Sequence, residues 1–371
     1  MNPFVYEQPR AIEPALAALA ATNSADIDDA ERWANARGLP KVLAGGTNLI
    51  DLMKENLMRP TALVDIRHLP LRDIAEQPDG SLYLGALATN AHTAQHPQVR
   101  ERYPVLRAAI LAGASPQVRN MASNGGNLLQ RTRCYYFYDA GVPCNKHRPG
   151  SGCPALTGLA RQHAILGASE HCIATHPSDM CVALAALGTT VHVESSARGP
   201  RTIPFEQFHR LPGDQPERDT TLEADELITH LVLPDSRRFA GHSCYLKLRE
   251  RASYAFAVVS VAAMLDLDHQ GLIREARLAL GGVAHKPWRD REAEAMLSGK
   301  PAEPASFAAA ADLLLKDARP AGGPALLESL PGNAYKIPLA RRAIVRALEM
   351  ARNGEVSNTG EDAFRFEEAA P

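Results

Sequence analysis

The order of apolar and polar positions predicts a chain of mixed helices and strands. Apolar residues recur at helical spacing in several stretches, which are expected to form amphipathic helices: residues 13–21, 50–54, 103–112, 180–187, 290–297, 306–315 and 338–352. Short apolar runs between turn residues predict strands at 41–43, 62–66, 81–85, 189–194, 227–233, 243–249, 256–267 and 273–280. Residues 131–158 follow neither period and are expected to form a long loop.

A change in the pattern divides the chain near residues 235–241. A polar, turn-rich stretch is followed there by one strand and by Pro234, after which a new series of strands begins. We therefore expect a first domain over residues 1–236 and a second over residues 237–352. Residues 353–371 contain four Glu and one Asp and show little periodicity. We expect them to form a flexible tail.

Composition and charge exclude several classes of protein. The 371 residues are 45% hydrophobic and 22% charged, which is ordinary for a folded soluble protein. A net charge of -2 gives no overall basic field for nucleic acid or an anionic membrane. The longest apolar stretch, residues 254–265, is too short for the roughly 20 residues of a bilayer span. The first residues do not have the pattern of a signal peptide, so we expect no export signal in this chain.

Two paired-glycine loops are candidate binding sites for a phosphate group. The first, residues 44–49 (AGGTNL), lies between a predicted strand and a predicted helix, and the second is residues 123–127 (SNGGN). Paired glycines let the backbone approach a ligand, and successive N–H groups in such a loop bind anions. A single Gly-Gly pair is nevertheless more often an ordinary turn. The chain contains neither GxGxxG nor a P-loop motif, so a nucleotide would be held by another scaffold.

Four of the six cysteines are concentrated in one segment: Cys134, Cys144, Cys153 and Cys172. Four thiolates are the usual ligand set of an iron–sulfur cluster, but they also suit structural zinc, and disulfides are a third alternative. Zinc is less favoured because two closely spaced Cys pairs are absent. Cations that would offset the charge of a thiolate-bound cluster flank the first two cysteines: Arg131, Arg133, Lys146 and Arg148. The residues alone favour an iron–sulfur cluster over zinc and disulfides.

The remaining polar residues allow two interpretations and predict no catalytic group. Asp179 begins a predicted helix, where it is either a first-turn acid or an acceptor for a cofactor hydroxyl. Lys247 lies on a predicted strand, for which a solvated strand face is the simpler interpretation. Cys181 and Cys244 are expected to be buried apolar residues. The chain contains neither a Ser-His-Asp signature nor HExxH, so we expect no catalytic residue in it.

Four motifs in a fixed order carry a resemblance to a known family. AGGTNL, ASPQVRNMASNGGNL, HPSDM and KLRERASYAFAVVSVAA resemble the FAD-binding subunits of molybdenum hydroxylases, the xanthine dehydrogenase and carbon monoxide dehydrogenase medium-subunit family. The resemblance extends over nearly the whole chain to about Ala351. The insert RCYYFYDAGVPCNKHRPGSGC with SEHCIATHPSDM resembles the flavin subunit of periplasmic aldehyde oxidoreductases, which carries a [4Fe–4S] cluster. The flavin subunit of 4-hydroxybenzoyl-CoA reductase has a comparable loop.

The resemblance implies an α+β fold in two domains. Residues 1–236 would form a two-part FAD-binding domain of the vanillyl-alcohol oxidase and p-cresol methylhydroxylase type, with an iron–sulfur loop at 131–173. Residues 237–352 would form a smaller α+β domain like the C-terminal domain of the carbon monoxide dehydrogenase flavoprotein. The mixed order of predicted strands and helices agrees with both domains.

The resemblance also implies roles for individual residues. Residues 43–49 would wrap the FAD pyrophosphate, and Lys247 would place a cation near the isoalloxazine ring. The implied FAD contacts are Leu43, Ala44, Gly45, Gly46, Thr47, Asn48, Leu49, Ser123, Asn124, Gly126, Asn127, Gln130, Asp179, Ile228 and Lys247. The implied ligands of a [4Fe–4S] cluster are Cys134, Cys144, Cys153 and Cys172.

The function that the resemblance implies is electron transfer within a heterotrimer. A large subunit with a molybdenum cofactor would oxidise an aldehyde, and a small subunit with [2Fe–2S] clusters would pass the electrons to the FAD of this chain and on to an external acceptor. The complex would be periplasmic, exported by a signal on a partner chain, and otherwise cytoplasmic. Three alternatives remain: the flavin subunit of a 4-hydroxybenzoyl-CoA reductase-like enzyme, a stand-alone FAD oxidoreductase, and a zinc protein with a scaffolding role.

Overall fold

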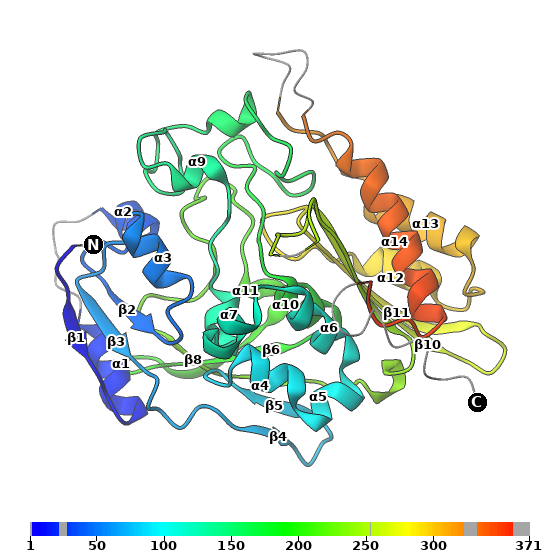
Figure 1. Cartoon of the computed structure of the whole chain (residues 1–371), viewed down its shortest axis with the longest axis horizontal. Coiled ribbons are helices and arrows are strands. Elements are labelled where there is room, and N and C mark those ends of the chain that lie inside the picture. The colour runs from blue at the N-terminus through cyan, green and yellow to red at the C-terminus, as the bar shows by residue number, and fades with distance from the viewer. Residues whose placement is uncertain (1, 22–27, 253, 323–331, 359–371) are drawn as a thin grey trace.

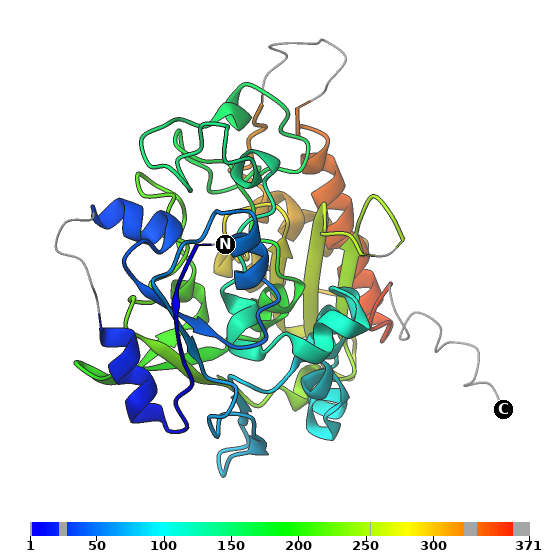
Figure 2. The same cartoon turned by 60° about the vertical axis from the view of Figure 1, so that its left-hand side comes forward.

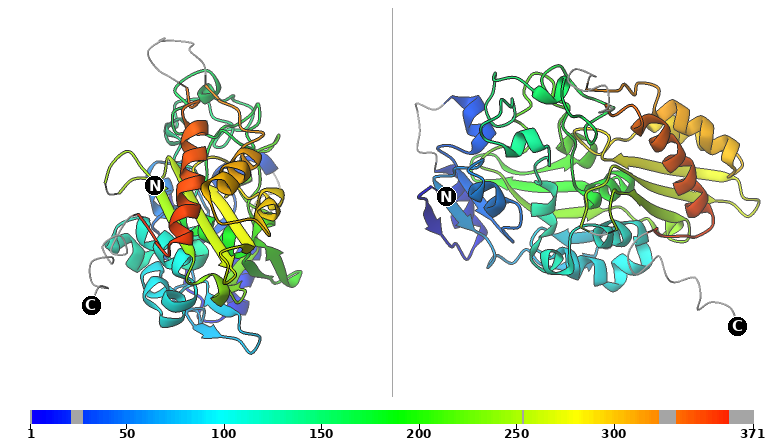
Figure 3. Two further views of the ribbon diagram at one scale, coloured as in Figure 1. Left: turned by 90° about the vertical axis from the view of Figure 1, so that its right-hand side faces the viewer. Right: turned by 45° about the horizontal axis from the view of Figure 1, so that its top comes forward.

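Three small β-sheets, each packed with helices, form the fold. The computed structural model describes residues 2–21, 28–252, 254–322 and 332–358. Within them the sheets have the strand orders β1-β3-β2, β4-β5-β8-β6-β7 and β11-β10-β9. The right-hand view of Figure 3 shows the three regions side by side in chain order, coloured blue, mostly green, and yellow to orange. Strands and helices are mixed throughout, as the sequence pattern predicts.

The N-terminal sheet is parallel, because helices connect its strands. Its strands are β1 (Val5–Glu7), β2 (Pro40–Leu43) and β3 (Ala62–Asp65), and its helices are α1 (Ile12–Ala20), α2 (Asp29–Asn35) and α3 (Leu49–Lys54). Buried side chains of α1 pack on β3 and the residues that follow it. The first glycine loop lies directly between β2 and α3, where the sequence pattern predicts it. Figure 2 brings this region forward.

The central sheet is antiparallel and is covered by helices. Its strands are β4 (Ile74–Glu76), β5 (Leu82–Gly85), β6 (Thr190–Ser195), β7 (Gly199–Pro204) and β8 (Leu227–Leu233). The helices of this region are α4 (Asn90–Gln95), α5 (Pro97–Arg102), α6 (Pro104–Ala112), α7 (Pro116–Met121), α8 (Asn124–Leu128), α10 (Asp179–Leu187) and α11 (Phe205–Phe208). Every residue of α10 is buried, so this helix forms the centre of the core.

The C-terminal sheet is an antiparallel layer covered by three helices. Its strands are β9 (Ser243–Leu248), β10 (Val259–Leu267) and β11 (Ile273–Gly281), and its helices are α12 (Arg291–Leu297), α13 (Pro304–Leu314) and α14 (Lys336–Arg352). The left-hand view of Figure 3 shows α14 lying along one face of the sheet. The other face packs against α10 and α6, so these two helices join the C-terminal sheet to the central region.

Residues 131–178 form a long loop, which extends beyond the predicted range of 131–158. Its regular elements are α9 (Tyr135–Tyr138) and a single 3-10 turn, η1 (Pro154–Leu156). The loop lies at the top of Figure 1 around α9. It returns to the C-terminal sheet, where Ile165 N–H donates to Val283 O and His176 N–H donates to Ala284 O. The loop therefore contacts both halves of the chain.

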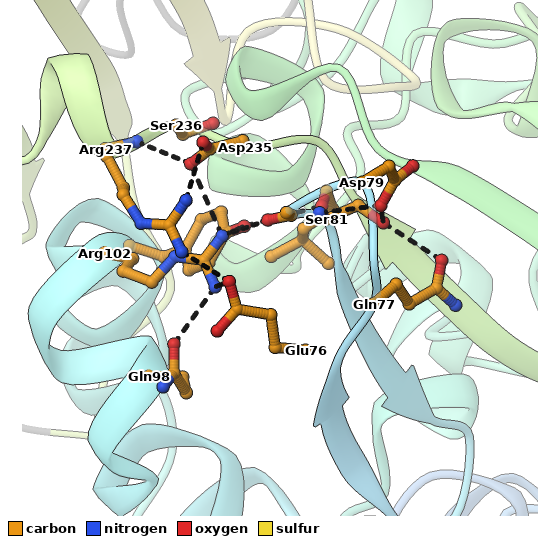
Figure 4. A network of polar contacts seen from close by, with 12 residues as sticks. Glu76, Gln77, Asp79, Ser81, Gln98, Arg102, Asp235, Ser236 and Arg237 are labelled. Carbon is orange, nitrogen blue, oxygen red and sulfur yellow. Dashed lines mark hydrogen bonds and ion pairs between the residues drawn. The ribbon is translucent and has the colours of Figure 1, made fainter.

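A buried arginine holds the region in which the domain boundary is expected. Arg102 at the end of α5 forms ion pairs with Glu76 at 3.3 Å and with Asp235 at 3.4 Å. Figure 4 shows its guanidinium group between these two carboxylates. Tyr103 OH donates to Pro234 O at 3.1 Å. The segment that follows β8 is therefore held against α5 and β4 by specific polar contacts.

The prediction of a flexible tail from residue 353 is wrong for its first residues. Residues 355–358 run beside β9, where Tyr245 N–H donates to Val356 O at 2.8 Å. The Asn358 side chain accepts from Lys247 N–H at 2.9 Å and donates to Lys247 O at 3.1 Å. These hydrogen bonds to the backbone of β9 extend the sheet. The acidic composition from which a flexible tail is predicted contains no information about them. Residues 359–371 lie outside the described residues.

Within the described ranges, no helix has both the length and the apolar character needed to cross a bilayer.

Candidate functional site

A single large cavity collects most of the residues that sequence analysis assigns to a cofactor. It has a volume of about 900 Å³, which is within the usual range for a cofactor site. It is bounded by the first glycine loop, the second glycine loop, the start of α10 and one end of β9. All the implied FAD contacts line this cavity except Leu43 and Asn124. The cavity therefore joins residues from every third of the chain.

The first glycine loop presents unpaired hydrogen-bond donors to the cavity. The backbone N–H groups of Gly46, Thr47 and Asn48 have no acceptor among the described residues. Asn48 Oδ1 accepts from Arg131 N–H at 3.2 Å, whereas Asn48 Nδ2 is buried and unpartnered. A buried donor without a partner, such as Asn48 Nδ2, costs free energy, and successive N–H groups bind anions, so this cradle suits an acceptor-rich group such as a pyrophosphate.

The second glycine loop is held in place by its own side chains. Sequence analysis treats it as a loop, but residues 124–128 form the short helix α8 because Ser123 Oγ accepts from Gly126 N–H at 3.2 Å. Asn127 Nδ2 donates to Asn90 Oδ1 at 2.8 Å, and Asn127 Oδ1 accepts from Gln130 and from Ser178. The amide of Asn127 therefore positions α8 against the start of α10.

Leu43 and Asn124 do not line the cavity, so the structure does not place them as FAD contacts. Leu43 packs into the apolar core between α3 and the cysteine loop. Asn124 is 0% exposed, and its Nδ2 donates to Gly85 O at 3.3 Å. Asn124 Oδ1 accepts from Asn90 and from Thr93 Oγ1. Both residues lie in the protein interior and stabilise the glycine loops there.

The inner end of the cavity contains a buried ion pair. Lys247 Nζ donates to Asp179 Oδ2 at 2.8 Å and to Ala112 O at 2.9 Å, and Tyr245 OH donates to Asp179 Oδ1 at 2.6 Å. Burial, followed by the charge of Asp179, raises the pKa of Tyr245 well above its ordinary value. Lys247 is 2% exposed, so its interpretation as part of a solvated strand face is wrong. Tyr245 and Lys247 are two residues apart on β9, so their side chains lie on the same face of the strand and both reach Asp179 at the start of α10.

Sequence analysis misses a lysine that also lines the cavity. Lys41 lies on β2, three residues before the first glycine loop. Burial, together with the nearby charge of Arg131, lowers the pKa of Lys41 to about 8. A cation in this position matches the negative charge of a pyrophosphate. The signal in the sequence was a lysine within an apolar strand that leads directly into a glycine loop.

The four clustered cysteines line one small pocket beside α9. The pocket also contains Lys146 and His163, and no cysteine among the described residues forms a disulfide. Burial raises the pKa of Cys134 to about 12 and that of Cys172 to about 11. His163 Nε2 lies 3.1 Å from Cys134 Sγ. Thiolates in this pocket therefore require a positively charged partner, which the iron atoms of a cluster supply.

The spacing of the sulfur atoms favours a multi-iron cluster over zinc. Four ligands of one tetrahedral zinc ion lie about 3.8 Å apart, as a Zn–S bond of about 2.3 Å requires. Within the described ranges, the group of His, Cys, Asp or Glu ligand atoms that all lie within 4.8 Å of one another is His176, Cys181 and His209. The four clustered sulfurs are thus more widely spaced than a zinc site needs.

Comparison with known proteins identifies the family. The family described as "FAD binding domain in molybdopterin dehydrogenase" matches residues 5–236, and "CO dehydrogenase flavoprotein C-terminal domain" matches residues 244–351. The chain is 45% identical to "Aldehyde oxidoreductase FAD-binding subunit PaoB" of Escherichia coli K12, over 95% of this chain and 99% of that protein. The chain belongs to the FAD-binding subunits of the molybdenum hydroxylase family. It is an oxidoreductase subunit with an FAD-binding domain, as the motifs imply.

More distant members share the fold along the whole chain. The carbon monoxide dehydrogenase medium chain of Hydrogenophaga pseudoflava is 27% identical over 94% of this chain and 96% of its own length. A solved structure of that dehydrogenase matches with a TM-score of 0.69 at 25% identity, covering 95% of this chain and 99% of that one. These matches confirm the implied fold, in which the FAD-binding domain is followed by a smaller α+β domain.

Proposed function

We propose that this chain binds FAD in the large cavity and a [4Fe–4S] cluster in the cysteine pocket, and that it transfers electrons within a heterotrimeric aldehyde oxidoreductase. The partners are a small subunit with [2Fe–2S] clusters and a large subunit with a molybdenum cofactor. The acceptor of the electrons is an external molecule. The observation that carries this proposal is that four free cysteines, two buried and two half-buried, line one pocket directly beside the FAD cavity.

The two sites are separated by one step along the backbone. Arg133 lines the FAD cavity and Cys134 lines the cysteine pocket. Consecutive Cα atoms are about 3.8 Å apart, so the linings of the two proposed sites adjoin at this point. The FAD supplies the ability to accept electrons one at a time and to release them as a pair.

The residues of this chain bind and orient the cofactors rather than perform acid–base chemistry. The glycine loops donate N–H groups to the pyrophosphate, and Lys41 supplies a positive charge there. At the inner end, Asp179 and Lys247 provide a fixed acceptor and donor for polar atoms of the flavin.

A cofactor assay on the purified complex tests the proposal. We expect visible absorption from flavin and from an iron–sulfur centre, with about four iron atoms and one FAD assigned to this chain, as a four-cysteine cluster requires. Cys144→Ser and Cys172→Ser should lose this iron and keep FAD. Cys244→Ser is the matched control, because Cys244 is buried beside Met350 in the C-terminal region. Zinc in place of iron at these cysteines would contradict the proposed cluster.

We propose in addition that the complex is periplasmic and is exported in folded form by a signal on a partner subunit. Cell fractionation tests this. The chain produced alone should remain in the cytoplasm, whereas the chain produced together with both partners should appear in the periplasm. Export of the chain without its partners would contradict this proposal.

A further inference from the structure

A buried group of charged side chains connects the cysteine pocket to the FAD cavity. Lys146 lines the cysteine pocket and is 1% exposed, whereas Arg131 and Asp219 line the FAD cavity. Lys146 Nζ donates to Asp219 Oδ1 at 2.6 Å, and Arg131 Nε donates to Asp219 Oδ2 at 2.8 Å. One carboxylate thus joins two cations, and the hydrogen bonds are continuous from one site to the other.

Three hydrogen-bond acceptors surround the Lys146 ammonium nitrogen. Besides Asp219, its Nζ contacts Pro216 O at 2.6 Å and His285 Nε2 at 2.8 Å, so each of its three N–H groups has an acceptor. His285 Nδ1 lies 3.1 Å from Arg210 O, which is consistent with donation from Nδ1 and a free lone pair on Nε2. His285 is therefore a neutral acceptor for Lys146.

The charges of this group do not balance. Arg131 and Lys146 contribute two positive charges, and Asp219 contributes one negative charge. An uncompensated buried charge is costly, so an additional negative charge is expected close by. Lys146 also lines the pocket of the four cysteines, and four thiolates give a bound cluster a net negative charge. The group is therefore complementary to an anionic cluster.

We propose that Lys146 raises the reduction potential of the iron–sulfur cluster and that Asp219 limits this increase. This inference rests on the proposed function, because it requires the cluster. Reduction adds one electron, and hence one negative charge, to the cluster. A buried cation stabilises the reduced form more than the oxidised form, and a nearby carboxylate has the opposite effect. Lys146 acts on the cluster through its electrostatic field and is a positioning residue.

An EPR-monitored redox titration of the assembled complex, with dithionite as the electron donor, tests the inference. The cluster signal is identified by its loss in Cys172→Ser. In Lys146→Met we expect the equilibrium constant for one-electron reduction to fall about tenfold, which corresponds to a midpoint about 59 mV lower. Asp219→Asn should shift the midpoint upward. Arg148→Met is the matched control: it removes an exposed cation from the same loop, so solvent screening should leave the midpoint unchanged.

The outcomes separate this inference from the proposed function. Wild-type protein without cluster iron would overturn both. A cluster with the same midpoint in wild type, Lys146→Met and Asp219→Asn would overturn only the role of Lys146. If Lys146→Met loses the cluster, Asp219→Asn decides alone. An upward shift then supports the inference, and an unchanged or lower midpoint overturns it.

Discussion

At the residue scale, Gly45 is a position at which the first glycine loop touches another part of the backbone. A Cβ at Gly45 would lie 1.9 Å from Met121 O and 2.6 Å from Met121 C. Both are backbone atoms, so no side-chain rotation relieves the contact. We expect Gly45→Ala to push the first glycine loop away from the end of α7. The variant should lose most of its FAD and be destabilised by about 1–3 kcal/mol.

The FAD content and the thermal midpoint of unfolding measure this effect. Gly241→Ala is the control, because a Cβ at Gly241 meets no atom within 4 Å and its backbone does not have the positive φ that favours glycine. Full FAD occupancy and an unchanged midpoint in Gly45→Ala would contradict the close approach of the two backbone segments.

Asn124 tests the distinction between a cofactor contact and a supporting residue. Its side chain makes buried hydrogen bonds to Asn90, Thr93 and Gly85 and does not line the cavity. We expect Asn124→Ala to lower the free energy of unfolding by about 1–3 kcal/mol, because its partners are left buried and unsatisfied. Urea denaturation measures this change. Weakened FAD binding without any loss of stability would instead indicate a direct contact.

At the element scale, the ion pair between Asp179 of α10 and Lys247 of β9 joins the central region to the C-terminal sheet. Asp179→Asn or Lys247→Met alone leaves one buried charge without its partner, which costs about 3–5 kcal/mol. The double variant removes both charges, so its cost should be clearly below the sum of the two single costs. Urea denaturation of the three variants measures the coupling.

A control for this cycle is the exposed ion pair between Arg341 and Asp312, whose atoms are 2.6 Å apart. Water screens this pair, so Arg341→Met should change stability little. Additive costs for Asp179→Asn and Lys247→Met would show that the two charges do not depend on each other.

Elements with local signals were predictable from the sequence, whereas contacts between distant elements were not. The strand, glycine loop and helix around residues 40–54 depend on adjacent residues, and the prediction agrees with the structure within a residue or two. The helix α8 was missed because the effect of Ser123 as a cap is offset by two glycines. The burial of Lys247 depends on which face of β9 meets α10, and the pattern along one strand does not contain this information. The same applies to Lys146, whose partners lie more than 65 residues away.

At the scale of the whole molecule, both candidate sites are assembled from parts that are far apart in the chain. The cavity draws on β2, α8, α10 and β9, and the network beside the cysteine pocket joins the loop to residues 216–219 and to His285. Buried histidines lie within this contact region. His209 Nε2, for example, lies 2.8 Å from Leu128 O at the end of α8. Protonation of such residues therefore acts on the connections between the elements of both sites.

These histidines predict a loss of stability in mild acid. Burial lowers the pKa of His209 to about 4 and that of His285 to about 3, below the ordinary value of about 6.5. Between pH 6.5 and 4 the unfolded chain therefore binds more protons than the folded chain. These histidines therefore leave the free energy of unfolding unchanged above about pH 6.5 and lower it as the pH drops from 6.5 to 4. Each such histidine contributes a slope of about 1.4 kcal/mol per pH unit.

His209→Gln isolates one of these contributions, because a glutamine amide retains a donor for Leu128 O and does not titrate. The thermal midpoint of the wild-type chain should fall between pH 7 and pH 5, and the fall should be smaller in His209→Gln. The variant takes up one proton fewer than the wild-type chain when it unfolds in acid. The shift of the thermal midpoint from its value at pH 7 should therefore differ most between the two proteins at the lower pH. Equal decreases in both proteins would mean that His209 takes up its proton over the same pH range in the folded and unfolded states, and that the buried contact with α8 tolerates a charge.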